Sequence, residues 1–200
     1  MRRNDVFTAM AFVSLVVLLV IELATKYDTW PRQVALSITN LVGGGIYLVI
    51  FFSLRRRGIA LPWIIAWLVA AGIWIDGLAN FQHLFGRILW WDKLAHFVGS
   101  MAPTAMFWAV LSEFHKKSLL RLPSWLTNIV SISLTMLIVV IYEISEYIGD
   151  QFFPTHRITD LYDTADDLMY NLLGAIIVVI FCILIARIKK NKENPRGVDL

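Results

Sequence analysis

Six long runs of apolar residues, separated by short polar connections, set the strongest limit on how this chain can fold. A helix needs about 20 apolar residues to cross the hydrocarbon core of a bilayer, and these runs reach that length. The backbone must satisfy its own hydrogen bonds in lipid, so such runs fold as helices. We therefore predict an all-α polytopic membrane bundle. Its six transmembrane helices would span about 6–24, 34–54, 62–83, 91–111, 125–147 and 164–187.

The composition supports this fold class and excludes others. Hydrophobic residues make up 58% of the chain, which is typical of integral membrane proteins. The single cysteine, Cys182, excludes a disulfide framework or a cysteine-based metal site within one chain. The first apolar run is longer than the hydrophobic region of a signal peptide, and no small-residue cleavage pattern follows it, so we interpret it as a retained helix. We expect one transmembrane domain over 1–188 and a polar cytoplasmic tail over 189–200.

The basic residues predict the orientation of the bundle. Six crossings place both chain ends on one side, and most of the 18 Lys and Arg residues fall on that side, including Arg55–Arg57. Because cytoplasmic connections are rich in Lys and Arg, we predict that both termini are cytoplasmic. The same argument explains the net charge of +3 without a nucleic-acid partner. Most acidic residues fall at the opposite, extracytoplasmic end.

Each of the last four predicted helices carries one polar stripe near its extracytoplasmic end. Within each stripe most residues are spaced by three or four positions, which places them on one helical face. Ionisable residues inside a membrane are costly and usually face the interior of a bundle, so the four stripes should face one another and form a polar pocket. The stripes comprise Asp76, Asn80 and His83; Asp92 and His96; Glu143, Glu146 and Asp150; and Asp163, Asp167 and Asn171.

The carboxylates of this pocket cannot all remain ionised without compensation. They must be protonated, paired with a cation or bound to a metal. The candidate internal cations are three basic side chains, Lys93, Arg87 and Arg157, together with the imidazoles of the histidines. Mixed histidine and carboxylate ligands suit Zn, Mn or Fe, so a divalent transition metal is the cofactor that the pocket would accept. The ligands in this hypothesis are His96, Glu143, Glu146 and Asp167.

Ordinary structural roles compete with this interpretation at some positions. Asp92 fits a helix N-cap, and Asp166 fits the acidic first turn of a helix. Asp167 also falls in that turn, but it aligns with polar residues further along the helix. Glu143 and Glu146 end a long apolar run, where no capping role exists. These two glutamates are therefore the strongest candidates for acid–base catalysis or metal binding.

Three separated blocks of sequence carry a resemblance to a known family. They are 91–97 (WDKLAHF), 142–146 (YEISE) and 163–174 (DTADDLMYNLLG). In this order they resemble the signature of VanZ-like membrane proteins and look closest to the YjdF-like branch. The resemblance implies a polytopic protein of the bacterial inner membrane that is associated with the cell envelope. VanZ-like proteins are linked to glycopeptide resistance.

These observations leave three functions open. The first is a metal-dependent enzyme that acts on a lipid or lipid-linked substrate, with Glu143 or Glu146 as ligand or general base. The second is a non-enzymatic accessory protein that binds a cationic or amphiphilic envelope molecule or a partner helix. The third is an ion-coupled transporter. A transport path needs polarity on both sides of the membrane, and the cytoplasmic halves of the helices look almost wholly apolar, which disfavours transport.

Overall fold

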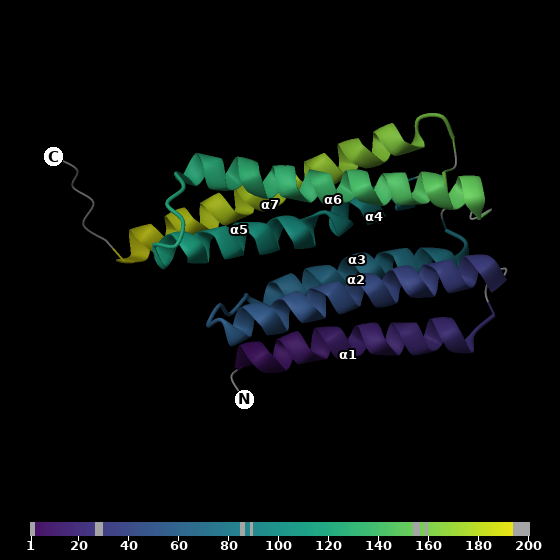
Figure 1. Ribbon diagram of the computed structural model, residues 1–200, viewed down its shortest axis with the longest axis horizontal. Coiled ribbons are helices and arrows are strands. Elements are labelled where there is room, and N and C mark those ends of the chain that lie inside the picture. The colour runs from purple at the N-terminus through teal and green to yellow at the C-terminus, as the bar shows by residue number, and fades with distance from the viewer. Residues whose placement is uncertain are drawn as a thin grey trace.

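The computed structural model describes residues 3–26, 30–84, 87–88, 90–153, 157–158 and 160–193. Within these residues the chain is all-helical and contains no β-strand. The helices lie along the longest dimension of the molecule (Figure 1). In chain order they are α1 (Arg3–Ala24), α2 (Trp30–Arg56), α3 (Trp63–Gln82), α4 (Trp91–Gly99), α5 (Met101–Lys116), α6 (Ser124–Phe152) and α7 (Asp163–Glu193).

Within the residues that the structure describes, five helical segments are long and apolar enough to cross a membrane. Their mean hydropathy runs from 1.4 to 2.8. Many outward-facing side chains are also apolar; Val13, Leu23 and Val49, for example, are 60–64% exposed. Extended apolar surfaces of this kind are costly in water but are matched by lipid. The described fold is thus a helical membrane bundle. The five segments are Arg3–Ala24, Trp63–Gln82, Trp91–Lys116, Ser124–Phe152 and Asp163–Lys189.

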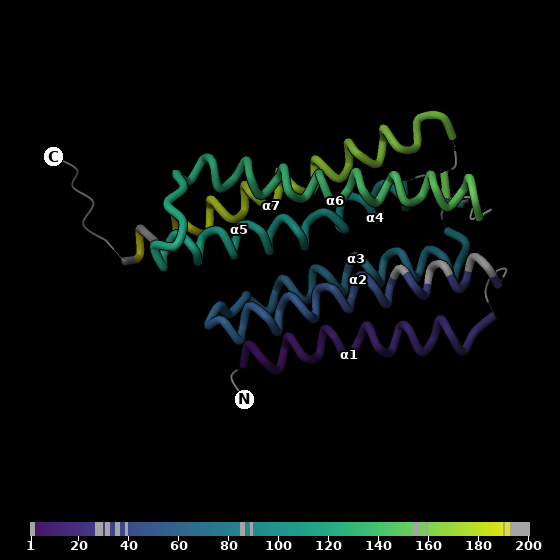
Figure 2. Tube along the Cα trace, in the orientation of Figure 1, coloured from purple at the N-terminus to yellow at the C-terminus, as the bar shows by residue number. Residues whose placement is uncertain are grey.

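The bundle consists of two groups of helices. Figure 1 shows α1–α3 on one side and α4–α7 on the other, and α3 joins the groups through its contacts with α4 and α5. In the second group α7 contacts α4, α5 and α6. The start of α1 and the end of α7 lie at the same end of the bundle, as the trace in Figure 2 shows. The end of α6 and the starts of α4 and α7 lie together at the opposite end (Figure 1).

Several helices extend beyond the apolar runs from which they are predicted. α2 begins at Trp30 rather than near residue 34, and α7 continues to Glu193 rather than ending near residue 187. Helical hydrogen bonds can continue into polar residues beyond the apolar run, and the apolar pattern does not record them. The tail expected over 189–200 therefore begins inside α7, and its residues 194–200 lie outside the described residues.

The helix expected over 91–111 is instead divided into α4 and α5. Pro103 explains the division, because it has no backbone N–H and its ring would collide with the carbonyl of Gly99 in an uninterrupted helix. Gly174 of α7 packs against this break. A Cβ atom added to Gly174 would lie 2.1 Å from the carbonyl oxygen of Phe97. α7 can therefore approach α4 this closely only because residue 174 has no side chain.

Buried hydroxyl groups line the contact between α5 and α6. Thr104 and Thr135 are buried, and their hydroxyl oxygens lie 2.9 Å apart. One turn earlier on α6, Ser131 is also buried and donates to the carbonyl oxygen of Thr127 at 2.7 Å. The expectation that the halves of the helices nearer the termini are almost wholly apolar is therefore wrong for α6. These hydroxyls donate to backbone carbonyls of their own helices, as in ordinary packing between membrane helices.

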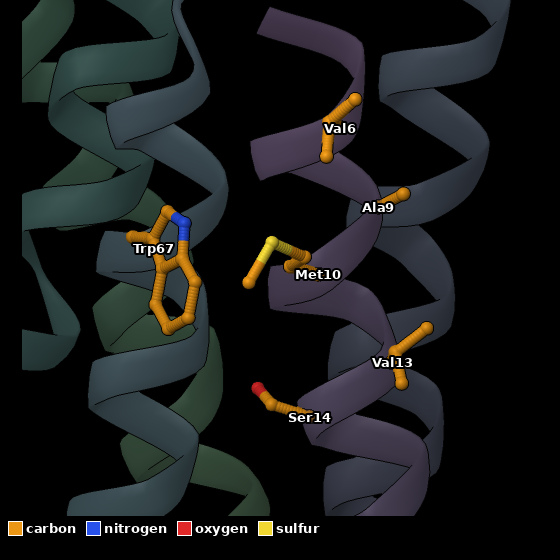
Figure 3. Close-up of a pocket in the computed structure, with 6 residues that line it drawn as sticks. All are labelled: Val6, Ala9, Met10, Val13, Ser14 and Trp67. Carbon is orange, nitrogen blue, oxygen red and sulfur yellow. The ribbon is translucent and has the colours of Figure 1, made fainter. Parts of the chain in front are cut away.

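A shallow groove of about 450 Å³ lies between the first half of α1 and α3. Figure 3 shows the Met10 side chain reaching toward the indole ring of Trp67. The groove lies near the start of α1, whereas the polar stripes of the sequence lie at the opposite end of the bundle. It is thus separate from the predicted polar pocket. Its lining residues are Val6, Ala9, Met10, Val13, Ser14 and Trp67.

The close approach at Gly174 yields a stability prediction. Gly174→Ala places a methyl group into a backbone carbonyl that cannot move without shifting α4, so we expect a loss of about 1–3 kcal/mol in the free energy of unfolding. Gly99→Ala is the matched control, because a Cβ atom there meets no other atom within 4 Å. Thermal unfolding in detergent measures both variants. Equal melting temperatures for the two variants would show that α7 does not pack against the break.

Candidate functional site

His96 of α4 stands at the centre of a buried polar cluster at the end of the bundle away from the termini. Its Nδ1 atom lies 3.7 Å from Oε1 of Glu143 on α6. Its Nε2 atom lies 3.4 Å from Oδ2 of Asp167 on α7 and 3.7 Å from Oδ1 of Asp92, one turn earlier on α4. Three helices thus place carboxylates around one imidazole ring, as the spacing of the polar stripes predicts.

Asn171 sets the protonation of this imidazole. Its side-chain nitrogen lies 2.9 Å from Nδ1 of His96 and also donates to the carbonyl oxygen of Asp167 at 2.8 Å. An amide nitrogen can only donate, so Nδ1 acts as the acceptor and a neutral ring carries its proton on Nε2. That proton points toward the carboxylates of Asp92 and Asp167. A neutral imidazole binds a metal through Nε2 only when its proton is on Nδ1, so metal binding at Nε2 would require the proton to move to Nδ1 and the Asn171 amide to turn its oxygen toward Nδ1.

Two overlapping groups of side chains could hold a metal ion. In each group the ligand atoms lie within 4.8 Å of one another. The first group is Asp92, His96 and Asp167, and the second is Glu143, Glu146 and Asp167. Asp167 belongs to both groups, so the cluster is continuous. All four ligands of the sequence hypothesis, His96, Glu143, Glu146 and Asp167, therefore meet in one place.

Two carboxylate oxygens in the cluster lack a hydrogen-bond partner among the described residues. They are Oε1 of Glu143 and Oδ1 of Asp167, in side chains that are only 5% and 2% exposed. An unpartnered carboxylate oxygen away from water costs several kcal/mol. Either a proton or a cation must therefore compensate these groups. Asp92, whose side chain is 32% exposed, lies nearest to the surface of the cluster.

Arg157 is the basic side chain that reaches the cluster among the described residues. Its guanidinium group lies 2.7 Å from Oε1 of Glu146 and donates to the Tyr142 hydroxyl at 2.5 Å. Burial alone would lower the pKa of Arg157. Tyr142 and the carboxylates of Glu146 and Asp76 outweigh it, so the pKa is raised and the side chain stays cationic. Sequence reasoning identified Arg157 only as one of three candidate cations.

The loop before α7 is held in place by Asp150. Its carboxylate accepts hydrogen bonds from the backbone N–H of Arg157 at 2.9 Å and of Ile158 at 2.8 Å. These bonds deliver the Arg157 side chain to Glu146. Asp150, whose spacing predicts that it lines the polar pocket, thus supports the cluster from the loop side.

The other two candidate cations lie elsewhere. Lys93 forms an ion pair with Asp166 of α7 at 2.6 Å, and both side chains are more than one-third exposed. Arg87 is exposed in the loop before α4. Asp166, interpreted from the sequence as a simple first-turn acid, therefore also links α4 to α7. Asp92 does not cap α4, because the N-cap residue is Trp90 and no side-chain cap bond forms.

The stripe on α3 joins the cluster only in part. Asp76 interacts electrostatically with Glu146 and Arg157. Asn80 is buried, but its amide donates to the backbone carbonyl oxygen of Asp76. His83 is exposed and caps the C-terminal end of α3 with a left-handed backbone conformation (φ 52°). Of the remaining predicted residues, Asp163 begins α7 and interacts electrostatically with Glu143 and Asp167.

Sequence reasoning missed two groups. In the sequence, Tyr142 is only the aromatic residue of a motif. In the structure, Arg157 contacts both the Tyr142 hydroxyl and the Glu146 carboxylate. Glu22 of α1 is a buried carboxylate that was left out of every predicted stripe. An acidic residue near the end of an apolar run was the available signal for Glu22.

The buried ion pair gives a prediction. Arg157→Ala leaves the carboxylate of Glu146 uncompensated, so we expect a loss of about 3 kcal/mol in the free energy of unfolding. The double variant Glu146→Gln, Arg157→Ala should recover part of that loss, because no unpaired charge remains. Arg87→Ala is the control and should change stability by less than about 0.5 kcal/mol. Denaturation in detergent measures all three. A double variant that is no more stable than Arg157→Ala would contradict the pairing.

Comparison with known proteins gives the chain a family. The family described as "Predicted membrane protein (DUF2238)" matches residues 6–188. A protein of Thermotoga maritima described as "Uncharacterized protein" is 30% identical over 122 residues, which are 60% of this chain and 57% of that protein. The aligned region thus spans less than two-thirds of the relative's length. No solved structure matches. Since the family match covers nearly the whole chain, this protein belongs to the DUF2238 family of predicted membrane proteins.

Proposed function

We propose that this protein is a multi-pass enzyme of the bacterial inner membrane that uses a divalent transition metal. The metal would lie between α4, α6 and α7, and the substrate would be a lipid or lipid-linked molecule of the cell envelope. The observation that carries this proposal is the pair of unpartnered carboxylate oxygens on Glu143 and Asp167, both buried beside His96.

The orientation in this proposal has six crossings and cytoplasmic termini. α4 and α5 follow one another within one membrane-length segment, so they count as one crossing. The start of α1 and the end of α7 lie at the same end of the bundle (Figure 1), as an even number of crossings requires. Most Lys and Arg residues also lie at that end, and the positive-inside rule favours it as the cytoplasmic end. The His96 cluster would then lie near the outer leaflet.

The donor set favours a transition metal over Mg²⁺ or Ca²⁺. One imidazole nitrogen with several carboxylate oxygens is a combination that suits Zn, Mn or Fe. Such an ion polarises a phosphoryl or acyl oxygen of the substrate, or lowers the pKa of a bound water. Glu146 already pairs with Arg157, so Glu143 is the carboxylate left for proton transfer. Arg157 would also neutralise developing negative charge next to the cluster.

The resemblance to VanZ-like and YjdF-like proteins supports the same proposal. The three blocks that resemble VanZ-like and YjdF-like proteins supply Asp92 and His96, Glu143 and Glu146, and Asp167 and Asn171. These side chains come from α4, α6 and α7. Asp92, Glu143, Asp167 and Asn171 surround the His96 ring, and Glu146 belongs to the same cluster beside Glu143 and Asp167. Residues that are separated in the sequence but adjacent in space favour a shared chemical role over a set of unrelated caps.

A second candidate is a non-enzymatic accessory protein. The observation that favours it is the internal neutralisation of Glu146 by Arg157, which is the expected arrangement for a purely structural ion pair. In this case the remaining acidic side chains would bind a cationic envelope molecule. Ion-coupled transport has less support, since the buried hydroxyls of α5 and α6 bond to backbone carbonyls rather than forming a continuous polar path.

Metal analysis separates the first two candidates. We expect detergent-purified protein to contain about one equivalent of Zn, Mn or Fe per chain, measured by elemental analysis. The double variant Glu143→Gln, Asp167→Asn should lose the metal, because both negative charges disappear, while Glu113→Gln, far along α5, should keep it. Metal-free wild-type protein that stays metal-free after incubation with each ion would refute the metal centre.

Cysteine labelling tests the orientation. In a Cys182→Ser background, Thr25→Cys lies just after α1, and Leu119→Cys lies in the loop between α5 and α6 at the opposite end. A membrane-impermeant maleimide should label residue 25 in intact cells and residue 119 only after the membrane is permeabilised. The reverse pattern would place the His96 cluster on the cytoplasmic side.

A further inference from the structure

A second buried carboxylate lies outside the His96 cluster, in the other group of helices. Glu22 occupies the last turn of α1, and its side chain is only 1% exposed. Its Oε2 atom has no hydrogen-bond partner among the side chains that the structure describes. The C-terminal end of a helix carries partial negative charge, which makes an ionised carboxylate at this position still more costly. Glu22 therefore needs compensation from outside its own helix.

One face of α2 is built around this carboxylate. The side-chain nitrogen of Gln33 donates to the backbone carbonyl oxygens of Glu22 and Thr25, each at 2.7 Å. Asn40, two turns further along α2, donates through its side-chain nitrogen to Oε1 of Glu22. Between them, Ser37 lies on the same helical face. It is only 5% exposed, and within the described part of the chain its hydroxyl group has no hydrogen-bond partner.

The third side of the site is formed by α3. A Cβ atom added to Gly77 would lie 3.3 Å from Oε1 of Glu22 and 3.1 Å from the terminal carbons of Leu18, so a side chain at residue 77 would crowd the Glu22 carboxylate. The neighbouring Asp76 interacts electrostatically with Glu22 and adds negative charge. No described Lys or Arg forms an ion pair with Glu22. The described part of the site thus holds negative charge and two unpartnered oxygens in a confined space.

We propose that Glu22, Ser37 and Asn40 form a binding site for Na⁺. The Glu22 carboxylate would neutralise the ion, and the hydroxyl of Ser37 and the amide oxygen of Asn40 would be neutral ligands. A set composed of oxygen atoms suits a hard cation and lacks the nitrogen or sulfur ligands that favour transition metals. Buried carboxylates and C-terminal helix ends are where membrane proteins coordinate Na⁺. The space limited by Gly77 and Leu18 favours Na⁺ over the larger K⁺.

This site shares no ligand with the proposed metal centre, but electrostatic interactions link the two. Asp76 interacts electrostatically with Glu22 on one side and with Glu146 on the other. Occupancy of the Na⁺ site would therefore change the electrostatic potential at the His96 cluster. The Na⁺ proposal does not require the metal centre, because none of its ligands belongs to that cluster.

Thermal unfolding of the full-length protein in detergent tests the proposal. NaCl replaces choline chloride at constant ionic strength, in a chelator-treated buffer. At an Na⁺ concentration about a hundred times the dissociation constant, we expect the melting temperature to rise by about 5–10 °C. Glu113→Gln is the matched control and should show the full rise. Glu22→Gln should show none, and Ser37→Ala should need about tenfold more Na⁺ for half of the rise, because it loses one ligand.

Three results would overturn the proposal. The first is a wild-type melting temperature that does not change with Na⁺ between pH 6 and pH 9, which would leave a proton as the occupant of the site. The second is an equal rise with KCl. The third is a full rise in Glu22→Gln, which would place the ion elsewhere. If Glu22→Gln does not fold, the Na⁺ titration of Ser37→Ala tests the proposal instead. A Ser37→Ala variant that needs the same Na⁺ concentration as the wild type for half of the rise in melting temperature would overturn the site.

Discussion

Compensation of buried carboxylates is the constraint on which this structure depends. Glu143, Glu146 and Asp167 are almost fully buried at one end of a lipid-facing bundle. Arg157 contacts Glu146, and His96 lies between the other two carboxylates. The imidazole can carry at most one positive charge, and Asn171 donates to it and thereby favours its neutral form. This imbalance is the physical basis for placing a cation in the cluster.

The helix packing and the cluster support each other. Pro103 ends the short α4 helix soon after His96, and Gly174 allows α7 to pack against that break. The same close approach brings Asp167, two turns earlier on α7, within 3.4 Å of the His96 ring. On the loop side, Asp150 holds the backbone at residues 157 and 158. Backbone contacts therefore help to fix the positions of Asp167 and Arg157, as a preorganised binding site would need.

The sequence predicts the convergence of α4, α6 and α7 because polar residues at helical spacing must face one another in lipid. The same reasoning overestimates the contribution of α3 to the cluster, because Asn80 donates a hydrogen bond to its own helix and His83 caps the end of that helix. It could not place the side chain of Arg157, because a loop conformation depends on contacts such as those of Asp150. The stripe pattern also did not identify Glu22, because the environment of Glu22 depends on how α1 and α2 pack and not on a stripe within one helix.

X-ray absorption spectroscopy at the metal edge tests directly whether a metal ion is bound by His96 between α4, α6 and α7. An ion bound there should have one imidazole nitrogen and several carboxylate oxygens at about 2.0–2.2 Å. The imidazole signal should disappear in His96→Gln. A protein whose bound metal keeps its imidazole signal in His96→Gln, or whose edge shows no histidine at all, would contradict the placement of the ion between α4, α6 and α7.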